Sequence, residues 1–148
     1  MPALIRPMQR ADIPALVSLE QGAFSDPWSA EAFAEELDNP HGITLVAEQN
    51  GVAGYLNAHH VLENVHINTF CVAPQRRRQG TGFALLQWLT GYAEGVGALE
   101  ITLEVRRGNE AAVSLYRKCG FAQVGLRKRF YRDPVEDALI LKKELSGL

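Results

Sequence analysis

One short segment combines residue types that could bind a ligand: Arg76-Arg77-Arg78-Gln79-Gly80-Thr81-Gly82. It follows a strand-like stretch, residues 66–72, and precedes an apolar, helix-like stretch, residues 83–89. The first N–H groups of a helix lack partners within the helix and lie at the positive end of its dipole, so they bind anions. Glycines let the backbone approach an anion closely, and three arginines add charge for its oxygens. The run predicts a phosphate-binding loop, with a plain strand-to-helix turn as the alternative.

The pattern Arg-x-x-Gly-x-Gly begins at Arg77. It is not a P-loop, because no Gly-Lys-Ser/Thr follows, and it is not the dinucleotide fingerprint, because Leu85 stands where that motif needs a third glycine. It resembles the pyrophosphate-binding motif of the GCN5-related N-acetyltransferases, the GNAT family. The resemblance implies that the loop holds the diphosphate of acetyl coenzyme A. The implied contacts are Arg77, Arg78, Gln79, Gly80, Thr81, Gly82 and Phe83.

A second segment, residues 109–121, resembles the next motif of that family, Asn-x-x-Ala-x-x-Leu-Tyr-x-x-x-Gly-Phe. The resemblance implies that Asn109 and Tyr116 contact the cofactor and that Tyr116 is the general acid. A phenol, with a pKa of about 10, can protonate the departing thiolate of coenzyme A. The alternative for Tyr116 is a core side chain with its hydroxyl on a backbone partner. We expect Asn109 to cap a helix as well.

Acetyl transfer to an amine needs the amine neutral, and an α-amino group titrates at about pH 8, so one general base suffices. Glu104 stands at the end of the predicted strand 99–105, where it could meet a substrate. We expect nearby apolar surface to raise its pKa and so to suit it to this task. The alternative is a solvated charge at the end of the sheet.

The resemblance also assigns residues Phe70, Cys71 and Val72 to the strand that pairs with the pantetheine arm. A backbone N–H near Val72 would then donate to the acetyl carbonyl oxygen and stabilise its developing charge. Cys71 is disfavoured as a nucleophile, because no base is adjacent in sequence and a buried thiol is normally inert.

Three further stretches, residues 19–29, 103–109 and 127–138, resemble one branch of the family, the bacterial ribosomal-protein alanine N-acetyltransferases. This resemblance implies that the acceptor is the N-terminal alanine of a small-subunit ribosomal protein. It also implies that Trp28 and Tyr131 line the acceptor groove, whereas hydrophobic cover over the sheet is their alternative role. Two other functions stay open: acetylation of a small amine such as a polyamine or aminoglycoside, and a non-catalytic acyl-coenzyme-A-binding module.

Composition bounds these hypotheses. The chain has 148 residues, so we expect one domain over residues 1–148. A formal net charge of −2 argues against general nucleic-acid binding. No apolar stretch is long enough for a membrane helix and no signal peptide is evident, so we expect a cytoplasmic protein without membrane contact. Cysteines and histidines lack metal-ligand spacing, so no metal is expected; the histidines are interpreted as surface or cross-strand residues. These side chains are Cys71, Cys119, His41, His59, His60 and His66.

Apolar periodicity positions these candidates on secondary structure. It predicts strands at residues 3–8, 43–48, 52–61, 65–72, 99–105, 121–127 and 136–144, and helices at residues 10–24, 29–37, 82–94 and 109–118. Asn50-Gly51 predicts a hairpin turn and Gly120 a helix C-cap. The order predicts an α/β (α+β) domain and resembles the GNAT fold, a mixed, mostly antiparallel sheet of about seven strands flanked by about four helices.

Overall fold

A computed structural model describes residues 2–145 and contains one seven-stranded sheet of order β1-β2-β3-β4-β5-β7-β6. The strands are β1 Leu4–Pro7, β2 Gly42–Glu48, β3 Val52–Val61, β4 Asn64–Val72, β5 Glu100–Arg106, β6 Ala122–Tyr131 and β7 Glu136–Glu144. The α-helices of the described residues are α1 Ile13–Ala23, α2 Ala30–Glu36, α3 Thr81–Gly95 and α4 Glu110–Lys118. Every strand pair is antiparallel except β4 with β5, which confirms the predicted fold class.

Turns and caps form where the local sequence favours them. Asn50 and Gly51 both have positive φ angles, 54° and 99°, as a type I′ hairpin turn requires. The side chains of Ser29 and Asn109 each accept a backbone N–H from the first turn of α2 and α4, at 3.1 Å and 3.2 Å. Gly120, with φ 96°, follows the end of α4. The predicted caps and the hairpin turn are therefore confirmed.

Two element boundaries differ from the prediction by more than two residues. Strand β6 continues to Tyr131 instead of ending at residue 127, because the pairing with β7 resumes at Glu136 after an irregularity. Residues 10–12 form a separate 3₁₀ turn ahead of α1. The carboxylate of Asp12 accepts the backbone N–H of Gln9 at 2.7 Å, which tightens this turn.

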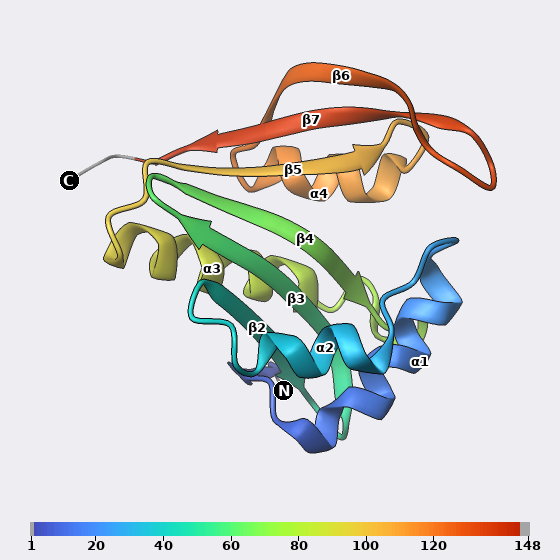
Figure 1. Cartoon of the computed structure of the whole chain (residues 1–148), viewed down its shortest axis with the longest axis vertical. Helices are drawn as coiled ribbons and strands as arrows, with labels where there is room; N and C mark the ends of the chain where they lie inside the picture. The colour runs from blue at the N-terminus through green and yellow to red at the C-terminus, as the bar shows by residue number, and fades with distance from the viewer. Residues whose placement is uncertain (1, 146–148) are drawn as a thin grey trace.

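The parallel pair of β4 and β5 is short, and this shapes the centre of the sheet. The two strands pair only where Asn64–His66 lie beside Glu100–Thr102, and beyond this point they diverge, as Figure 1 shows. In the β3–β4 ladder Asn57 pairs with Thr69 but Ala58 pairs with Ile67, so one extra residue, a β-bulge, bends β4. The far end of β4 therefore has a strand partner on one side only within the described residues.

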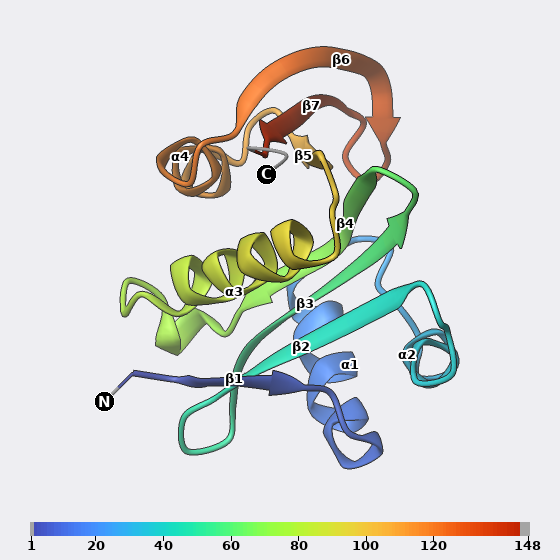
Figure 2. The same ribbon diagram turned by 90° about the vertical axis from the view of Figure 1, so that its left-hand side faces the viewer.

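Helices cover both faces of the sheet, with α3 and α4 on one face and α1 and α2 on the other (Figure 2). The larger core, under α3 and α4, includes Leu45, Leu56, Val65, Leu85, Leu89, Leu103, Val113, Tyr116 and Leu141. The smaller core, under α1 and α2, includes Met8, Ile13, Leu16, Phe33, Val46, Tyr55 and Cys71. Side chains that alternate along a strand thus enter different cores, as Tyr55 and Leu56 do.

A buried carboxylate joins the second core to the loop before α2. Glu20 is only 1% exposed. It accepts hydrogen bonds from the Tyr55 hydroxyl at 2.6 Å, from the Thr69 hydroxyl, and from the backbone N–H of Trp28 at 2.9 Å. A buried charge is tolerated only when its oxygens are hydrogen-bonded, and here three donors meet that need. Glu20 therefore links α1 to β3, to β4 and to the α1–α2 loop.

We predict that Glu20→Ala lowers the free energy of unfolding by about 3 kcal/mol or more, because it leaves three donors without an acceptor. Urea denaturation measures this change. Glu35→Ala is the matched control, since Glu35 is an exposed residue on α2, and it should change stability by less than about 0.5 kcal/mol. Equal losses in the two variants would contradict the structural role of Glu20.

We also predict that Gly82→Ala destabilises the fold by about 1–3 kcal/mol through overpacking. A Cβ at Gly82 would lie 2.9 Å from Leu115 Cδ2 and 3.2 Å from Phe70 Cζ. Gly91 lies in the same helix with nothing within 4 Å of an added Cβ, so Gly91→Ala should stabilise by about 0.5–1 kcal/mol. Opposite signs in urea unfolding are the expected result, and stabilisation by both substitutions would refute the packing argument.

Candidate active site

The arginine–glycine loop leads from β4 into α3, as the sequence predicts. Gly80 is the residue before α3, and its φ of 82° is a left-handed conformation that favours glycine. The backbone N–H groups of Arg78 to Phe83 donate no hydrogen bond to any other residue within 2–145. They lie at the positive end of a helix of 15 residues, so they form a suitable anion site.

Two residues of this loop act differently from the prediction. Arg76 was expected to offer charge to an anion, but its guanidinium donates to the carbonyl of Asn50 at 2.9 Å and to that of Gln49. It therefore anchors the loop to the β2–β3 turn. Gly82 faces Phe70 and Leu115 closely, so packing between α3, β4 and α4 also requires a glycine there. Arg77 and Arg78 are exposed and remain available to a ligand.

The open edge of β4 lies beside this loop. Ala73 donates its N–H to the carbonyl of Ala53 on β3 at 2.8 Å. Because alternate residues of a strand direct their N–H groups to opposite edges, the N–H of Val72 points toward the side where β5 has diverged. Cys71, the residue before Val72, is buried, and burial raises the pKa of its thiol, so it is protonated at neutral pH. The geometry gives Cys71 no features of a nucleophile.

Glu104 lies on β5 just beyond the segment that pairs with β4. Its Oε1 is 3.1 Å from Nε2 of His66, and its Oε2 is 3.9 Å from Nε of Arg127. The prediction of a raised pKa is wrong: the hydrogen bond from His66 outweighs burial, and the charge of Arg127 adds to it, so the pKa of Glu104 is lowered. The carboxylate is therefore ionised at neutral pH and 20% exposed, which suits a proton acceptor.

His66 is the residue that sequence reasoning did not assign to the site. It was interpreted as a surface or cross-strand residue, and it is indeed opposite Thr102 in the β4–β5 register. Glu104 follows Thr102 by two residues and so lies on the same face of the sheet. The two-residue spacing of Thr102 and Glu104 could have revealed the contact with His66, but only once β4 and β5 are known to be parallel neighbours.

Tyr116 lies on α4 with its ring against Phe70 and Phe121, at centroid distances of 5.8 Å and 5.5 Å. Burial, with smaller effects of Tyr131 and Cys119, raises its pKa well above the ordinary value. Its hydroxyl makes no hydrogen bond within residues 2–145, although every fully buried side-chain polar atom there has a partner. The hydroxyl is therefore not completely enclosed, although the residue as a whole is buried, and it holds its proton at neutral pH.

Trp28 and Tyr131, which are expected to line an acceptor groove, belong to two segments that Arg106 joins. Arg106, at the end of β5, covers the ring of Tyr131 at 4.5 Å and donates to the Ser25 hydroxyl at 3.0 Å and to the Arg132 carbonyl at 2.8 Å. Ser25 belongs to the same loop as Trp28, whose ring packs on Phe33. Arg106 thus joins the α1–α2 loop to the β6–β7 hairpin.

Burial, together with the nearby Glu104 carboxylate, raises the pKa of Tyr131 to about 12. Glu104 therefore affects Tyr131, and Tyr131 in turn affects Tyr116. The three side chains come from β5, β6 and α4 and share one electrostatic environment. Tyr131 thus lies within electrostatic range of both members of the predicted catalytic pair.

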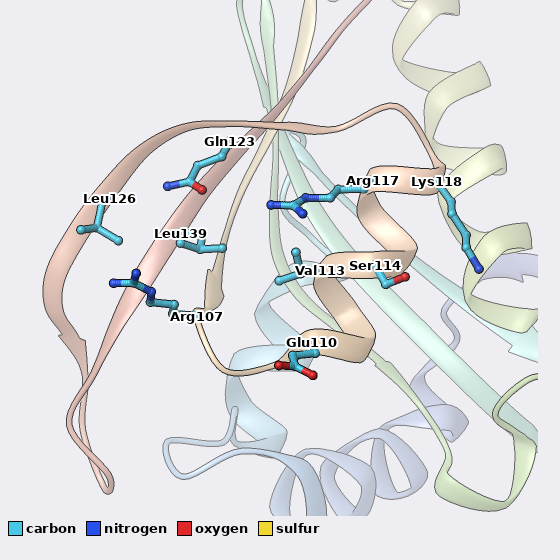
Figure 3. Close-up of a pocket in the computed structure, with 9 residues that line it drawn as sticks. All are labelled: Arg107, Glu110, Val113, Ser114, Arg117, Lys118, Gln123, Leu126 and Leu139. Carbon is cyan, nitrogen blue, oxygen red and sulfur yellow. The ribbon is translucent and has the colours of Figure 1, made fainter.

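A cavity of about 720 Å³ lies elsewhere, between α4 and the curved β6–β7 pair (Figure 3). It is lined by Arg107, Glu110, Val113, Ser114, Arg117, Lys118, Gln123, Leu126 and Leu139. None of the predicted site residues borders it, and the side of α4 that forms it does not include Tyr116. We therefore separate this cavity from the site around Glu104.

Two structural findings bear on other kinds of site. Within residues 2–145, no helix is both long enough and apolar enough to cross a membrane. The same residues contain no cluster of three or more histidine, cysteine, aspartate or glutamate side chains that could hold a metal ion.

Comparison with known proteins gives a consistent result. A putative [ribosomal protein bS18]-alanine N-acetyltransferase of Bacillus subtilis is 35% identical over 141 residues, which cover 94% of this chain and 93% of the relative. The [ribosomal protein bS18]-alanine N-acetyltransferase of Escherichia coli (strain K12) is 34% identical over 145 residues, 96% of this chain and 97% of the relative.

A crystal structure of the ribosomal-protein-S18-alanine N-acetyltransferase from Escherichia coli superposes with a TM-score of 0.88 at 33% identity, covering 97% of this chain and 94% of that one. Residues 13–121, which include the arginine–glycine loop, Glu104 and Tyr116, match the acetyltransferase (GNAT) family. The chain therefore belongs to the GNAT family of acetyltransferases.

Proposed function

We propose that this enzyme transfers the acetyl group of acetyl coenzyme A to the N-terminal α-amino group of a protein, namely the N-terminal alanine of ribosomal protein bS18. The proposal treats residues 1–148 as one N-acetyltransferase domain. One observation carries it: Glu104 follows the point where β4 and β5 separate, and the ring of Tyr116 lies 5.8 Å from that of Phe70 on the open edge of β4. Near-full-length similarity to two bS18-alanine N-acetyltransferases supports the choice of acceptor.

Acetyl coenzyme A would bind along β4 and at the start of α3. The unpaired N–H groups of Arg78 to Phe83, with the exposed side chain of Arg77, suit its diphosphate. The free edge at Phe70–Val72 suits the pantetheine arm, which carries amides that can pair like a strand. The side-chain oxygen of Asn109 caps α4, which leaves its NH₂ group for the same arm.

The reaction follows from the charges of the site. The amine enters in its neutral form, and Glu104 accepts one proton from its nitrogen as that nitrogen attacks the acetyl carbonyl carbon. Negative charge develops on the carbonyl oxygen, and the N–H of Val72 stabilises it. When the carbon–sulfur bond breaks, the thiolate takes a proton from the Tyr116 hydroxyl. Tyr116 regains this proton from solvent and Glu104 releases its own, so the site returns to its starting state.

The acceptor side favours a protein N-terminus with a small first residue. Tyr131 presents aromatic surface within electrostatic range of Glu104, and Arg106 joins its hairpin to the α1–α2 loop that includes Trp28. A small polyamine would call for additional free carboxylates. Glu136, the nearest candidate on the hairpin, is occupied by Arg106 at 3.1 Å and by the N–H of Gly108 at 2.6 Å.

The acceptor can be tested with purified protein, acetyl coenzyme A and three peptides. The first begins Ala-Arg with a free N-terminus, the second is the same peptide with a blocked N-terminus, and the third is blocked and contains lysine. We expect thiol release with the free peptide alone, with mass spectrometry locating the acetyl group on the α-amine. Turnover on the blocked lysine peptide would refute the proposed acceptor class.

We predict that Glu104→Gln lowers kcat by about 10²–10⁴-fold, because an amide cannot accept the proton. Steady-state kinetics on the free peptide measures this loss, and calorimetry should give unchanged acetyl coenzyme A affinity. Glu94→Gln, at an exposed position on α3, is the control and should retain full turnover. Normal turnover by Glu104→Gln would favour the non-catalytic binding module.

Tyr116→Phe should lower kcat by about 10²-fold or more while leaving stability nearly unchanged, because the removed hydroxyl makes no hydrogen bond within the described residues. Tyr92→Phe, on α3 and stacked on Trp88, is the matched control with no expected effect on turnover. If the two variants are equally active, Tyr116 is not the general acid.

A further inference from the structure

We propose that His66 is a positioning residue for Glu104: a directed chain of hydrogen bonds from Asn64 through Thr102 fixes the His66 imidazole so that its Nε2–H orients the Glu104 carboxylate. The inference rests on the proposed role of Glu104 as general base. It adds a residue to the mechanism that belongs to neither family motif found in the sequence.

The chain runs along the one segment where β4 and β5 are paired. Asn64 Nδ2 lies 2.9 Å from Thr102 Oγ1, and Thr102 Oγ1 lies 2.7 Å from His66 Nδ1. His66 Nε2 lies 3.1 Å from Glu104 Oε1. The links alternate between the two strands, so the contacts depend on the parallel register that sets His66 opposite Thr102.

The donors and acceptors have one consistent assignment. The Asn64 NH₂ group donates both to Thr102 Oγ1 and to Glu100 Oε2, each at 2.9 Å, so Thr102 accepts from Asn64. The Thr102 hydroxyl proton is then directed to His66 Nδ1, which accepts it. With the Thr102 hydroxyl directed in this way, Nε2 carries the ring proton and donates to Glu104.

This arrangement separates the two oxygens of Glu104. Oε1 receives the hydrogen bond from His66, while Oε2 faces Arg127 at 3.9 Å and remains for the substrate amine. His66 is the main cause of the lowered pKa of Glu104, with Arg127 on β6 as a weaker contributor. The other titratable groups around the chain are Tyr131 on β6, Glu100 on β5 and Lys142 on β7.

The position of these hydrogen bonds in the sheet explains why they help to orient Glu104. Glu104 lies beyond the paired segment, where β5 no longer has β4 beside it. Asn64, His66 and Thr102 all lie within that segment, where the sheet is continuous. The hydrogen-bond chain therefore connects the proposed base to the rigid, paired part of the sheet. Without it, no contact with the paired segment would orient the partly exposed side chain of Glu104.

The first test is spectroscopic and needs no turnover. Nitrogen-15 NMR of the imidazoles, with His66 assigned by His66→Gln, should reveal a hydrogen on Nε2 and none on Nδ1. Thr102→Val removes the hydroxyl that directs this tautomer and should increase the Nδ1-protonated fraction. A wild-type His66 protonated at Nδ1, or a tautomer unchanged in Thr102→Val, would overturn the assignment.

The second test compares two substitutions of His66. His66→Ala should lower kcat roughly 10-fold with an unchanged KM for acetyl coenzyme A, because Glu104 loses a charge-assisted hydrogen bond. His66→Gln should recover most of kcat, since its amide N–H can donate from nearly the same place as Nε2. His60→Ala, at a residue whose ring contacts the Leu62 carbonyl, is the control and should be fully active.

Carbon-13 NMR of the Glu104 carboxyl supplies a readout that a merely structural role would not change. Its pKa should rise toward the ordinary glutamate value in His66→Ala and stay low in His66→Gln. Circular dichroism confirms that each variant is folded, and the partial exposure of His66, 30% for its side chain, favours this.

The outcomes separate the two proposals. If Glu104→Gln keeps full turnover, the proposed function fails whatever His66 does. If Glu104→Gln is inactive but His66→Ala has normal kcat and an unchanged Glu104 titration, the role of His66 fails and the function stands.

Discussion

The early separation of β4 from β5 is the constraint on which the rest of the site depends. Three residues of each strand pair, and the bulge at Asn68 then bends β4 away. Glu104 lies on the face that includes Thr102, whereas Tyr116 is held in the core on the opposite face. A continuous sheet would keep two such side chains apart. Only where the strands diverge can groups from both faces meet at one substrate.

Two carboxylates illustrate how environment assigns different tasks to one side-chain type. Glu20 is buried and accepts three hydrogen bonds, so both its oxygens are committed to holding α1 and the loop at Trp28. Glu104 is partly exposed, with the His66 imidazole 3.1 Å from one oxygen and the Arg127 guanidinium at the longer distance of 3.9 Å from the other. The first arrangement stabilises a fold, and the second keeps a base ionised and oriented.

Most of the fold was predictable because its signals are local. Apolar periodicity located each strand and helix, Asn50-Gly51 specified a turn, and the glycine at position 80 marked the start of α3. The lowered pKa of Glu104 was not predictable, since it arises from a histidine that is distant in sequence and becomes a neighbour through strand pairing. The anchoring role of Arg76 was missed for the same reason, because its partners belong to the β2–β3 turn.

Arg106 has a consequence for how this architecture can diversify. It joins Ser25, Tyr131 and Arg132, which belong to the two segments on the acceptor side, and none of these lies in the loop that precedes α3. The surface that would choose the acceptor is therefore braced independently of the surface that would bind the acetyl donor. As long as Arg106 keeps its partners, substitutions in the two acceptor segments would change which N-terminus is accepted. The residues that would bind the acetyl donor would not need to change.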